Sequence, residues 1–397
     1  MTSEWNHFAL GEITELVIDY RGKTPKKLGG DWCKQGYRAL SAKNIKTGRI
    51  VQAETIRYID ESLYRKWMKD EVQRGDILIT SEAPFGQIFF WDSDEKIVLS
   101  QRLFCVRIKP EYDARFIYYY MTTPEFQSEL DGRATGTTVI GLRQPELMKC
   151  IIRCPEIQEQ KVIAAILSSI DAKIIANEKV NDNLYAQAKA IFDNHFINID
   201  AIPAGWRKGN LLDIANYLNG LAMQKFRPQG HEIGLPVLKI KELRQGSCDD
   251  SSELCSLSIK PEYIIHNGDV IFSWSGSLLV DIWCGGTCGL NQHLFKVTSD
   301  VYDKWFYYLW TAHHLARFIA IAADKATTMG HIKREELAKA EVLIPCEEDY
   351  TSFNSIMQPI FELIISNRIE SRKLAALRDE LLPKLMTGEI DVSDVQF

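Results

Sequence analysis

LSQRLFCV at residues 99–106 and LNQHLFKV at residues 290–297 are nearly the same pattern, written twice in one chain. The likeness continues upstream, where Gly75-Asp76 in RGDILITSEAP matches Gly268-Asp269 in NGDVIFSWSGS. The offset between the copies stays near about 190 residues, and self-similarity at a fixed period indicates an internal repeat. The chain is therefore a tandem duplication in which each half forms one unit.

Each half carries the same order of strand and helix signals. Short runs rich in β-branched and aromatic residues, bounded by Gly, Asn and Asp, predict strands. The stretches around 113–130 and 302–322 predict helices whose aromatic residues belong to the core. We expect an α+β fold, with two similar α+β domains separated by two long helices that form an antiparallel coiled coil. The predicted boundaries are domain 1 at 1–155, helix 1 at 156–197, domain 2 at 198–345, and helix 2 with a C-terminal tail at 346–397.

A heptad seam follows each domain. Spacings of four and three residues select Ile163, Leu167, Ile170, Ile174, Asn177, Asn181, Leu184, Ala188 and Ile191, and in the second copy Phe353, Met357, Ile360, Ile364, Asn367, Ser371, Leu374, Arg378 and Leu381. An amphipathic helix needs a partner for its apolar stripe, and the two-fold relation between the copies favours antiparallel pairing. Asn177 and Asn367 are predicted to share a polar layer that fixes the helix register. About 28 residues at ~1.5 Å each span roughly 40 Å, close to one turn of DNA.

Charge is unevenly distributed along the chain. The net charge is −6, which argues mildly against a nucleic-acid partner. Between Arg21 and Arg49, however, nine basic residues face a single acid, Asp31. This segment is either one cationic surface on an acidic protein or a solvated charged loop.

Cysteine usage and hydropathy point to a soluble protein of the cytoplasm. Nine cysteines without framework spacing indicate a reducing compartment, and no apolar run is long enough to cross a bilayer. Cys284 and Cys288 near His293 have no second ligand pair, so we expect buried thiols rather than a zinc site.

Catalytic signatures are not found in the sequence. There is no G-x-G-x-x-G after a strand, no complete P-loop, no G-x-S-x-G and no H-E-x-x-H. No acidic cluster recurs in both halves. A duplicated chain of this kind is better interpreted as a ruler or adaptor than as a catalyst.

Taken together, these features resemble the specificity subunit of type I restriction-modification systems, over essentially the whole chain. The residues that carry the resemblance are Pro203-Ala204-Gly205-Trp206-Arg207, the Gly-Asp pairs at 75–76 and 268–269, the segments 100–101 and 291–292, the Thr-Thr loops, PEIQEQKVIAAILSSIDAKI at 155–174 and LLPKLMTGEIDV at 381–392. Two departures from the family pattern concern the start of the first copy and the start of the second long helix. The first copy opens MTSEW without a Pro-x-Gly-Trp start, and PCEEDYTSF at 345–353 stands where the family keeps a Glu-Gln helix opening.

The resemblance implies a non-catalytic subunit with two target recognition domains, each of which reads one half of a bipartite, asymmetric DNA site. It implies that the helices act as a spacer and dock two adenine-methyltransferase subunits, and that restriction (translocase-nuclease) subunits join them. S-adenosylmethionine, ATP and Mg would then belong to the partner subunits, with no cofactor, metal or catalytic residue in this chain.

DNA contacts are expected from basic and polar side chains of both domains. For the first domain we predict phosphate contacts from Lys23, Thr24, Lys26, Lys27 and Lys43, and base contacts from Ser81, Gln101 and Arg102. The matched set in the second domain is Lys239, Lys241, Ser273, Ser275, Gln292 and His293. The loop residues Thr137, Thr138, Thr327 and Thr328 are also predicted to touch DNA. On the exposed helix faces, Gln158, Glu159 and Lys161, and the surface near Arg368 and Arg372, are candidates for partner docking.

The sequence leaves alternatives open. Gln101 and Gln292 sit in identical apolar frames and are equally compatible with a purely structural role, whereas the change from Arg102 to His293 favours the reading of different half-sites. The chain as a whole could instead be a stand-alone DNA methyltransferase or nuclease, or a coiled-coil scaffold that binds only protein. Steep salt dependence of DNA binding would separate the scaffold from the DNA reader.

Overall fold

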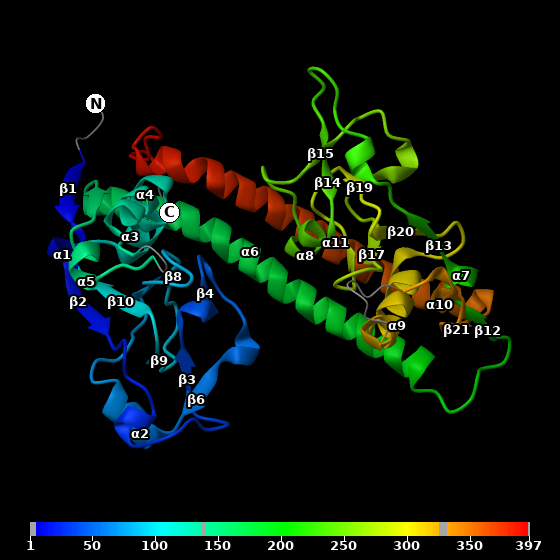
Figure 1. The fold of residues 1–397 in the computed structure, drawn as a ribbon, viewed down its shortest axis with the longest axis horizontal. Coiled ribbons are helices and arrows are strands. Elements are labelled where there is room, and N and C mark those ends of the chain that lie inside the picture. The colour runs from blue at the N-terminus through cyan, green and yellow to red at the C-terminus, as the bar shows by residue number, and fades with distance from the viewer. Residues whose placement is uncertain (1–4, 137–139, 325–331, 396–397) are drawn as a thin grey trace. The chain divides into compact units, whose positions relative to one another are not determined.

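The computed structural model describes residues 5–136, 140–324 and 332–395, and these form two compact units. The first unit contains residues 1–172 and 376–397, and the second contains residues 173–375. Each unit therefore combines the domain of one repeat with helix segments from both repeats. Figure 1 shows this interleaving, because the red C-terminal helix segment belongs to the blue and cyan unit.

The first unit is built on a four-stranded antiparallel sheet with a smaller sheet beside it. The main sheet has the order β2 (Thr14–Asp19), β10 (Leu103–Ile108), β7 (Ile77–Thr80), β8 (Ile88–Phe90), and the smaller has β6 (Arg57–Ile59), β3 (Tyr37–Leu40), β9 (Val98–Leu99). The short pairs are β1 (Asn6–Ala9) with β11 (Ile151–Cys154) and β4 (Ile45–Lys46) with β5 (Arg49–Ile50). The helices are α1 (Leu10–Ile13), α2 (Glu61–Trp67), α3 (Ala114–Met121), α4 (Pro124–Arg133) and α5 (Gln144–Leu147).

The second unit repeats this plan. Its main sheet has the order β13 (Asn216–Asn219), β20 (Leu294–Thr298), β17 (Val270–Ser273), β18 (Leu279–Ile282), and the smaller has β15 (Leu254–Cys255), β14 (Leu235–Leu238), β19 (Cys288–Leu290), β16 (Ile264–Ile265). β12 (Arg207–Asn210) pairs with β21 (Glu341–Ile344), and the helices are α7 (Leu211–Ile214), α8 (Ile240–Gln245), α9 (Lys304–Asp324) and α10 (Arg334–Ala338). The predicted duplication of an α+β domain is confirmed.

The repeated stretch LSQRLFCV is two strands rather than one. Val98-Leu99 pairs in parallel with β3, and Leu103 begins β10 in the other sheet, so the chain changes sheets at Gln101-Arg102. The second copy does the same, because Leu290 pairs with β14 and Leu294 with β17. A turn therefore interrupts the repeated pattern at the same place in each repeat.

The aromatic helical stretches belong to the core, as predicted. Phe116, Tyr119 and Met121 of α3 are buried, and so are Trp305 and Phe306 of α9. The first stretch differs from expectation because it divides into α3 and α4. Pro124 occupies the first turn of α4, and the Thr123 hydroxyl accepts a hydrogen bond from the Phe126 amide, which starts a new helix there.

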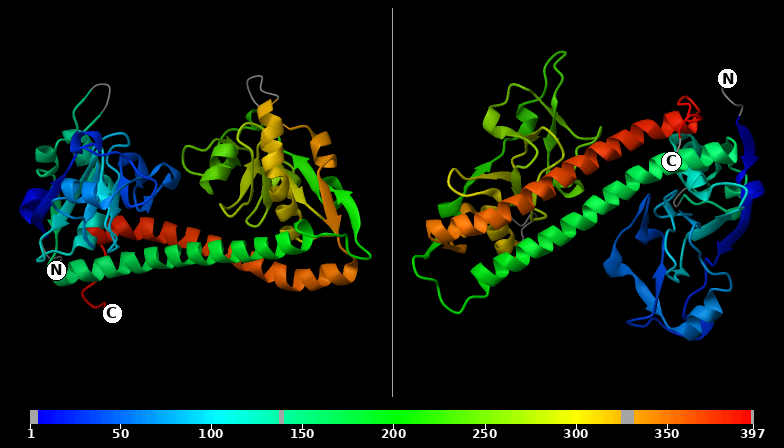
Figure 2. Two further views of the ribbon diagram at one scale, coloured as in Figure 1. Left: turned by 90° about the horizontal axis from the view of Figure 1, so that it is seen from below. Right: turned by 180° about the vertical axis from the view of Figure 1, so that it is seen from behind.

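Two long helices, α6 (Ile157–Phe192) and α11 (Glu347–Met386), lie side by side and run antiparallel, as Figures 1 and 2 show. In the first unit, Nη1 of Arg378 on α11 lies 2.8 Å from Oδ1 of Asp171 on α6. In the second unit, Asn177 on α6 bonds Ser371 on α11. The antiparallel arrangement that was expected from the two-fold relation of the repeats is confirmed.

The polar layer of the helix pair differs in detail from the expectation. Asn177 donates to Glu370 Oε2 at 2.7 Å and to Ser371 Oγ at 3.2 Å, while Asn367 donates to Asn181 Oδ1 at 2.9 Å. Asn177 and Asn367 thus occupy two cross-paired layers instead of one shared layer. Each seam has two polar positions, Asn177 and Asn181 on α6 and Asn367 and Ser371 on α11. In the antiparallel pair, the first polar position of one helix lies opposite the second polar position of the other.

In the described part of the chain, no helix is both long and apolar enough to span a bilayer. Cys284 and Cys288 are buried, as predicted. Among the described residues, no three His, Cys, Asp or Glu side chains are placed so that they could hold one metal ion.

Candidate nucleic-acid interface

The turn between the two sheets is built alike in both repeats. In the first unit, the Ser81 amide donates to the Arg102 carbonyl at 2.9 Å, and the Ser81 carbonyl accepts from the Leu142 amide at 3.0 Å. In the second unit, Trp274 makes the corresponding bonds to His293 at 3.4 Å and Ile332 at 3.1 Å. These bonds make Ser81 equivalent to Trp274. It follows that Glu82 is equivalent to Ser275, and Arg102 to His293.

At the turn of the first unit, acidic and basic side chains gather around a cavity of about 350 Å³, which is lined by Asp19, Arg21, Gly22, Glu82, Gln101 and Arg102. Arg102 Nε lies 3.2 Å from Glu82 Oε1. Arg21 forms a two-pronged pair with Asp19, at 2.9 and 2.8 Å, and stacks over the Phe104 ring at 4.1 Å. The cavity therefore presents two guanidinium groups, each next to a carboxylate.

The backbone around this cavity is conformationally unusual. Arg102 has a φ of 65° and Ala83 a φ of 44°, and among the described residues only one other non-glycine, Gln52, has a positive φ. A left-handed conformation costs an L-residue roughly 1–2 kcal/mol. Such backbone is retained where the surrounding structure demands a particular side-chain direction, and it is enriched at functional sites.

The equivalent turn of the second unit carries a neutral set of partners. Ser275 Oγ lies 2.9 Å from His293 Nδ1, and Gln292 Nε2 lies 3.4 Å from His293 Nε2. Trp274 Nε1 donates to Asn219 Oδ1 at 2.9 Å, where the first unit has Asp19. The same backbone frame thus presents an ion pair in one unit and a hydroxyl–imidazole pair in the other.

The predicted lysines of the smaller sheets lie next to these turns. The Ala42 amide donates to the Gln101 carbonyl, which brings the exposed side chain of Lys43 beside the first turn. Leu40 and Leu238 occupy equivalent positions, so Lys241 corresponds to Lys43. Lys239 pairs with Glu253 at 2.5 Å, and Lys241 lies 2.8 Å from Ser251 Oγ.

The basic segment between Arg21 and Arg49 is only partly exposed to solvent. Lys26 and Lys27 are exposed on a single 3₁₀ turn, and Lys27 Nζ donates to the Gly22 carbonyl at the rim of the cavity. Thr24 is half-buried beside them. Lys23 instead donates to the Trp67 carbonyl and lies over the Tyr20 ring, and burial together with Lys69 lowers the pKa of its ammonium.

Several predicted residues lie away from the surface or outside the described chain. Ser81 is buried, and its hydroxyl makes no hydrogen bond within the described residues. Ser273 is fully buried and donates to the Ser275 carbonyl. Thr137, Thr138, Thr327 and Thr328 fall outside the described residues.

Sequence reasoning missed Glu82, Asp19 and Arg21 in the first unit, and Trp274 and Asn219 in the second. A signal for Glu82 was present, because the repeat alignment matches it to Ser275, which was selected. Arg21 and Asp19 carried no comparable signal, since only the pairing of β2 with β10 brings them to the turn.

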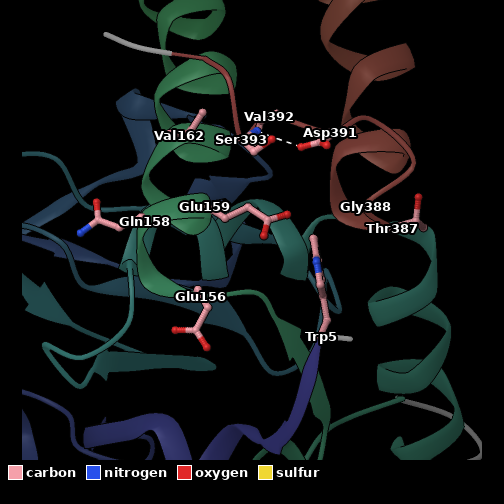
Figure 3. Close-up of a pocket in the computed structure, with 10 residues that line it drawn as sticks. All are labelled: Trp5, Glu156, Gln158, Glu159, Val162, Thr387, Gly388, Asp391, Val392 and Ser393. Carbon is pink, nitrogen blue, oxygen red and sulfur yellow. Dashed lines mark hydrogen bonds between the residues drawn. The ribbon is translucent and has the colours of Figure 1, made fainter. Parts of the chain in front are cut away.

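A second cavity in the first unit, of about 520 Å³, lies where α6 begins and α11 ends (Figure 3). It is lined by Trp5, Glu156, Gln158, Glu159, Val162, Thr387, Gly388, Asp391, Val392 and Ser393. The lining contains three carboxyl groups and no basic side chain. Figure 3 shows Glu156, Glu159 and Trp5 around one opening, with Asp391 held by the Ser393 amide at 2.9 Å. The surface near Arg368 is different, because this side chain is engaged by Asp281 and the Ile282 carbonyl.

The comparisons with known proteins agree with one another. The family model of the type I restriction modification DNA specificity domain matches residues 2–185. The MjaIX specificity subunit of Methanocaldococcus jannaschii is 27% identical over 347 residues, covering 81% of this chain and 79% of its own. The HindI specificity subunit of Haemophilus influenzae is 18% identical over 405 residues, covering 81% of this chain and 88% of its own.

A solved structure supports the same fold. The S subunit of a type I restriction-modification system from M. genitalium matches with a TM-score of 0.57 over 96% of both chains, at 15% identity. The family model and the relatives lead to one conclusion: the chain is similar to DNA specificity subunits of type I restriction-modification systems, the family model over the first repeat and the relatives over most of its length.

Proposed function

We propose that each α+β domain reads one half of a bipartite, asymmetric DNA site and that the helix pair sets the spacing between the halves. The observation that carries the proposal is the equivalent turn, where one backbone frame holds Glu82 and Arg102 in one unit and Ser275 and His293 in the other. A shared structural role would favour the same residues twice. Different polar groups on one frame are what two readers of different sequences require, since base edges are distinguished by their donor and acceptor patterns.

The phosphate contacts of this proposal come from Lys26, Lys27 and Lys43 in the first domain and from Lys239 and Lys241 in the second. These lysines lie next to the turns, which supports the proposal, because phosphate contacts position a protein while nearby base contacts specify the sequence. The overall charge of −6 is compatible with such local basic surfaces.

Catalysis, in this proposal, belongs to partner subunits in the cytoplasm. Two adenine-methyltransferase subunits dock on the helix pair, with translocase-nuclease subunits joining for restriction, and these bind S-adenosylmethionine, ATP and Mg. The acidic cavity at the ends of α6 and α11 supports docking, because three carboxyl groups around Trp5 and two valines suit a basic side chain of a partner.

The experiment is modified-base sequencing of genomic DNA from the host with and without this gene. Loss of N6-methyladenine from one bipartite motif is the expected result, and co-purification of methyltransferase subunits with the tagged chain tests the docking. If every methylated motif persists in the deletion strain and the chain recovers no methyltransferase, the proposal is wrong.

A further inference from the structure

The two turns share a feature beyond their backbone. In each turn, one side chain contacts a side chain of the loop that follows strand β7 in the first unit or strand β17 in the second. The partners are Glu82 and Arg102 in the first unit and Ser275 and His293 in the second. A backbone hydrogen bond joins Ser81 to Arg102 in the first unit and Trp274 to His293 in the second. Glu82 and Ser275 directly follow the donors of these bonds, so the fold places the two members of each pair next to each other.

The first pair leaves a recognition edge available. Arg102 contacts Glu82 through Nε, and its two terminal nitrogens have no hydrogen-bond partner in the described part of the chain. The side chain is 46% exposed and lines the 350 Å³ cavity, so this edge is open to solvent. Two parallel N–H groups match O6 and N7 of guanine in the major groove, which is the commonest specific contact of arginine with DNA.

The role of Glu82 follows from the same geometry. A guanidinium that is held at Nε by a carboxylate loses rotational freedom and keeps its outer edge aimed in one direction. The carboxylate also cancels the charge, so the pair attracts phosphate less than a lone arginine would. This combination suits base recognition better than backbone binding. The left-handed backbone of Arg102 fixes the direction of the side chain further.

We propose that positions 82 and 102, and the equivalent positions 275 and 293, are two-residue specificity modules, and that Arg102 reads a guanine while Glu82 positions it. The inference rests on the proposed function and deepens it. In the second unit the Ser275 hydroxyl lies 2.9 Å from Nδ1 of His293 and Gln292 Nε2 lies 3.4 Å from its Nε2, so that module reads its own half-site through a different set of polar groups.

The test is modified-base sequencing with the complete system in its host. In Arg102→Ala, one guanine of one half-site becomes degenerate, with discrimination falling by roughly 10- to 100-fold, and the other half-site is unchanged. Glu82→Gln makes the same guanine of the half-site degenerate to a smaller extent. His293→Ala acts only on the opposite half-site. Arg74→Ala is the matched control, because Arg74 pairs with Asp92 and Asp94 at the other end of β7 and leaves the motif intact.

Arg102→Lys separates base reading from phosphate binding. It keeps the charge but loses the planar fork, so we expect the same degenerate guanine, whereas a phosphate contact would be largely preserved. The inference is overturned if Arg102→Ala lowers methylation equally at all sites of an unchanged motif, or if the degenerate position is not a guanine. Should Arg102→Ala fail to accumulate, Arg102→Lys decides alone. Failure of the proposed function would be seen separately, as a wild-type gene whose deletion removes no motif.

Discussion

A side chain that reads a base must be held more firmly than an ordinary surface residue, and the first turn holds Arg102, the base reader of our proposal, in this way. Arg102 is fixed from three directions, by the Ser81 amide on its carbonyl, by Glu82 at Nε and by its own left-handed backbone. Its neighbour Arg21 is fixed by Asp19 and Phe104. The conformational cost of such positioning falls on folding rather than on DNA binding, where it would weaken affinity.

The strain at Arg102 is measurable. At an ordinary exposed position Gly is less stable than Ala by about 0.5–1 kcal/mol, because it has more conformational freedom to lose. At a φ of 65° we expect the reverse order, with Arg102→Gly more stable than Arg102→Ala by about 0.5–1 kcal/mol, since both variants lose the Glu82 contact and only Gly loses the strain. Urea denaturation of both variants checks this.

The control for this comparison is Arg65 on α2, an exposed helical residue. There Arg65→Gly should be less stable than Arg65→Ala by about 1 kcal/mol. If the two variants at position 102 follow the same order as the two at position 65, the turn is not strained in solution.

The sequence reveals this site only in part, for physical reasons. Arg102 and His293 stand out because they differ between identical neighbours, a Gln before them and Leu-Phe after them. The contact of Arg102 with Glu82 depends on the hydrogen bond between Ser81 and Arg102 on two strands. The position of Asp19 and Arg21 at this turn depends on the pairing of β2 with β10, so neither is encoded by local periodicity. Buried Ser273 shows the opposite error, because alternation along a strand does not reveal which polar residue faces the interior.

At the scale of elements, the long helices are the most predictable part of the chain. Their start after Pro155 and Pro345, their apolar seams and their antiparallel course all follow from periodicity and duplication. The pairing of the polar residues does not follow from them, because a change of four residues in the register between the two helices exchanges Asn367 for Ser371 as the partner of Asn177. Such a shift changes no residue type in the seam pattern.

The Asn177 contact gives a test of this pairing. Asn177 is 3% exposed and bonds Glu370 and Ser371, so Asn177→Ala should lower the free energy of unfolding by about 1–2 kcal/mol, although alanine is the better helix former. Asn183→Ala, at an exposed site of the same helix, should be neutral or slightly stabilising. Thermal unfolding compares the two variants.

A double-mutant cycle identifies the partner. Combining Asn177→Ala with Ser371→Ala should cost less than the sum of the two single changes, because the second change removes a bond that is already lost. Strict additivity would mean that these residues do not meet in solution.

At the scale of the whole molecule, each unit is completed by residues far away in the sequence. Leu385, Met386 and Val392 are buried in the core that contains Leu10, Ile152 and Ile163, while Met357 and Phe361, on the same helix α11, belong to the core of the second unit. Arg378 adds a polar link within the first unit. Burial disfavours its charged form, but bonds to Asp171 and Asp379 outweigh this and raise its pKa, and Tyr119 also bonds Asp171. Helix α11 is therefore one covalent element that serves two cores.

Two substitutions on α11 should consequently act on different halves of the chain. Leu385 and Met357 are each 1% exposed, and truncating either to alanine should cost about 2–5 kcal/mol through lost burial and a residual cavity. Hydrogen exchange followed by peptide mass spectrometry locates the effect, because protection falls in the unit that loses stability. Leu385→Ala should deprotect β1, β11 and α3 and leave β17 and β20 unchanged, whereas Met357→Ala should do the opposite. Uniform deprotection by both variants would show instead that the two units unfold as a single cooperative structure, in which case a destabilised domain would impair the reading of both half-sites rather than one.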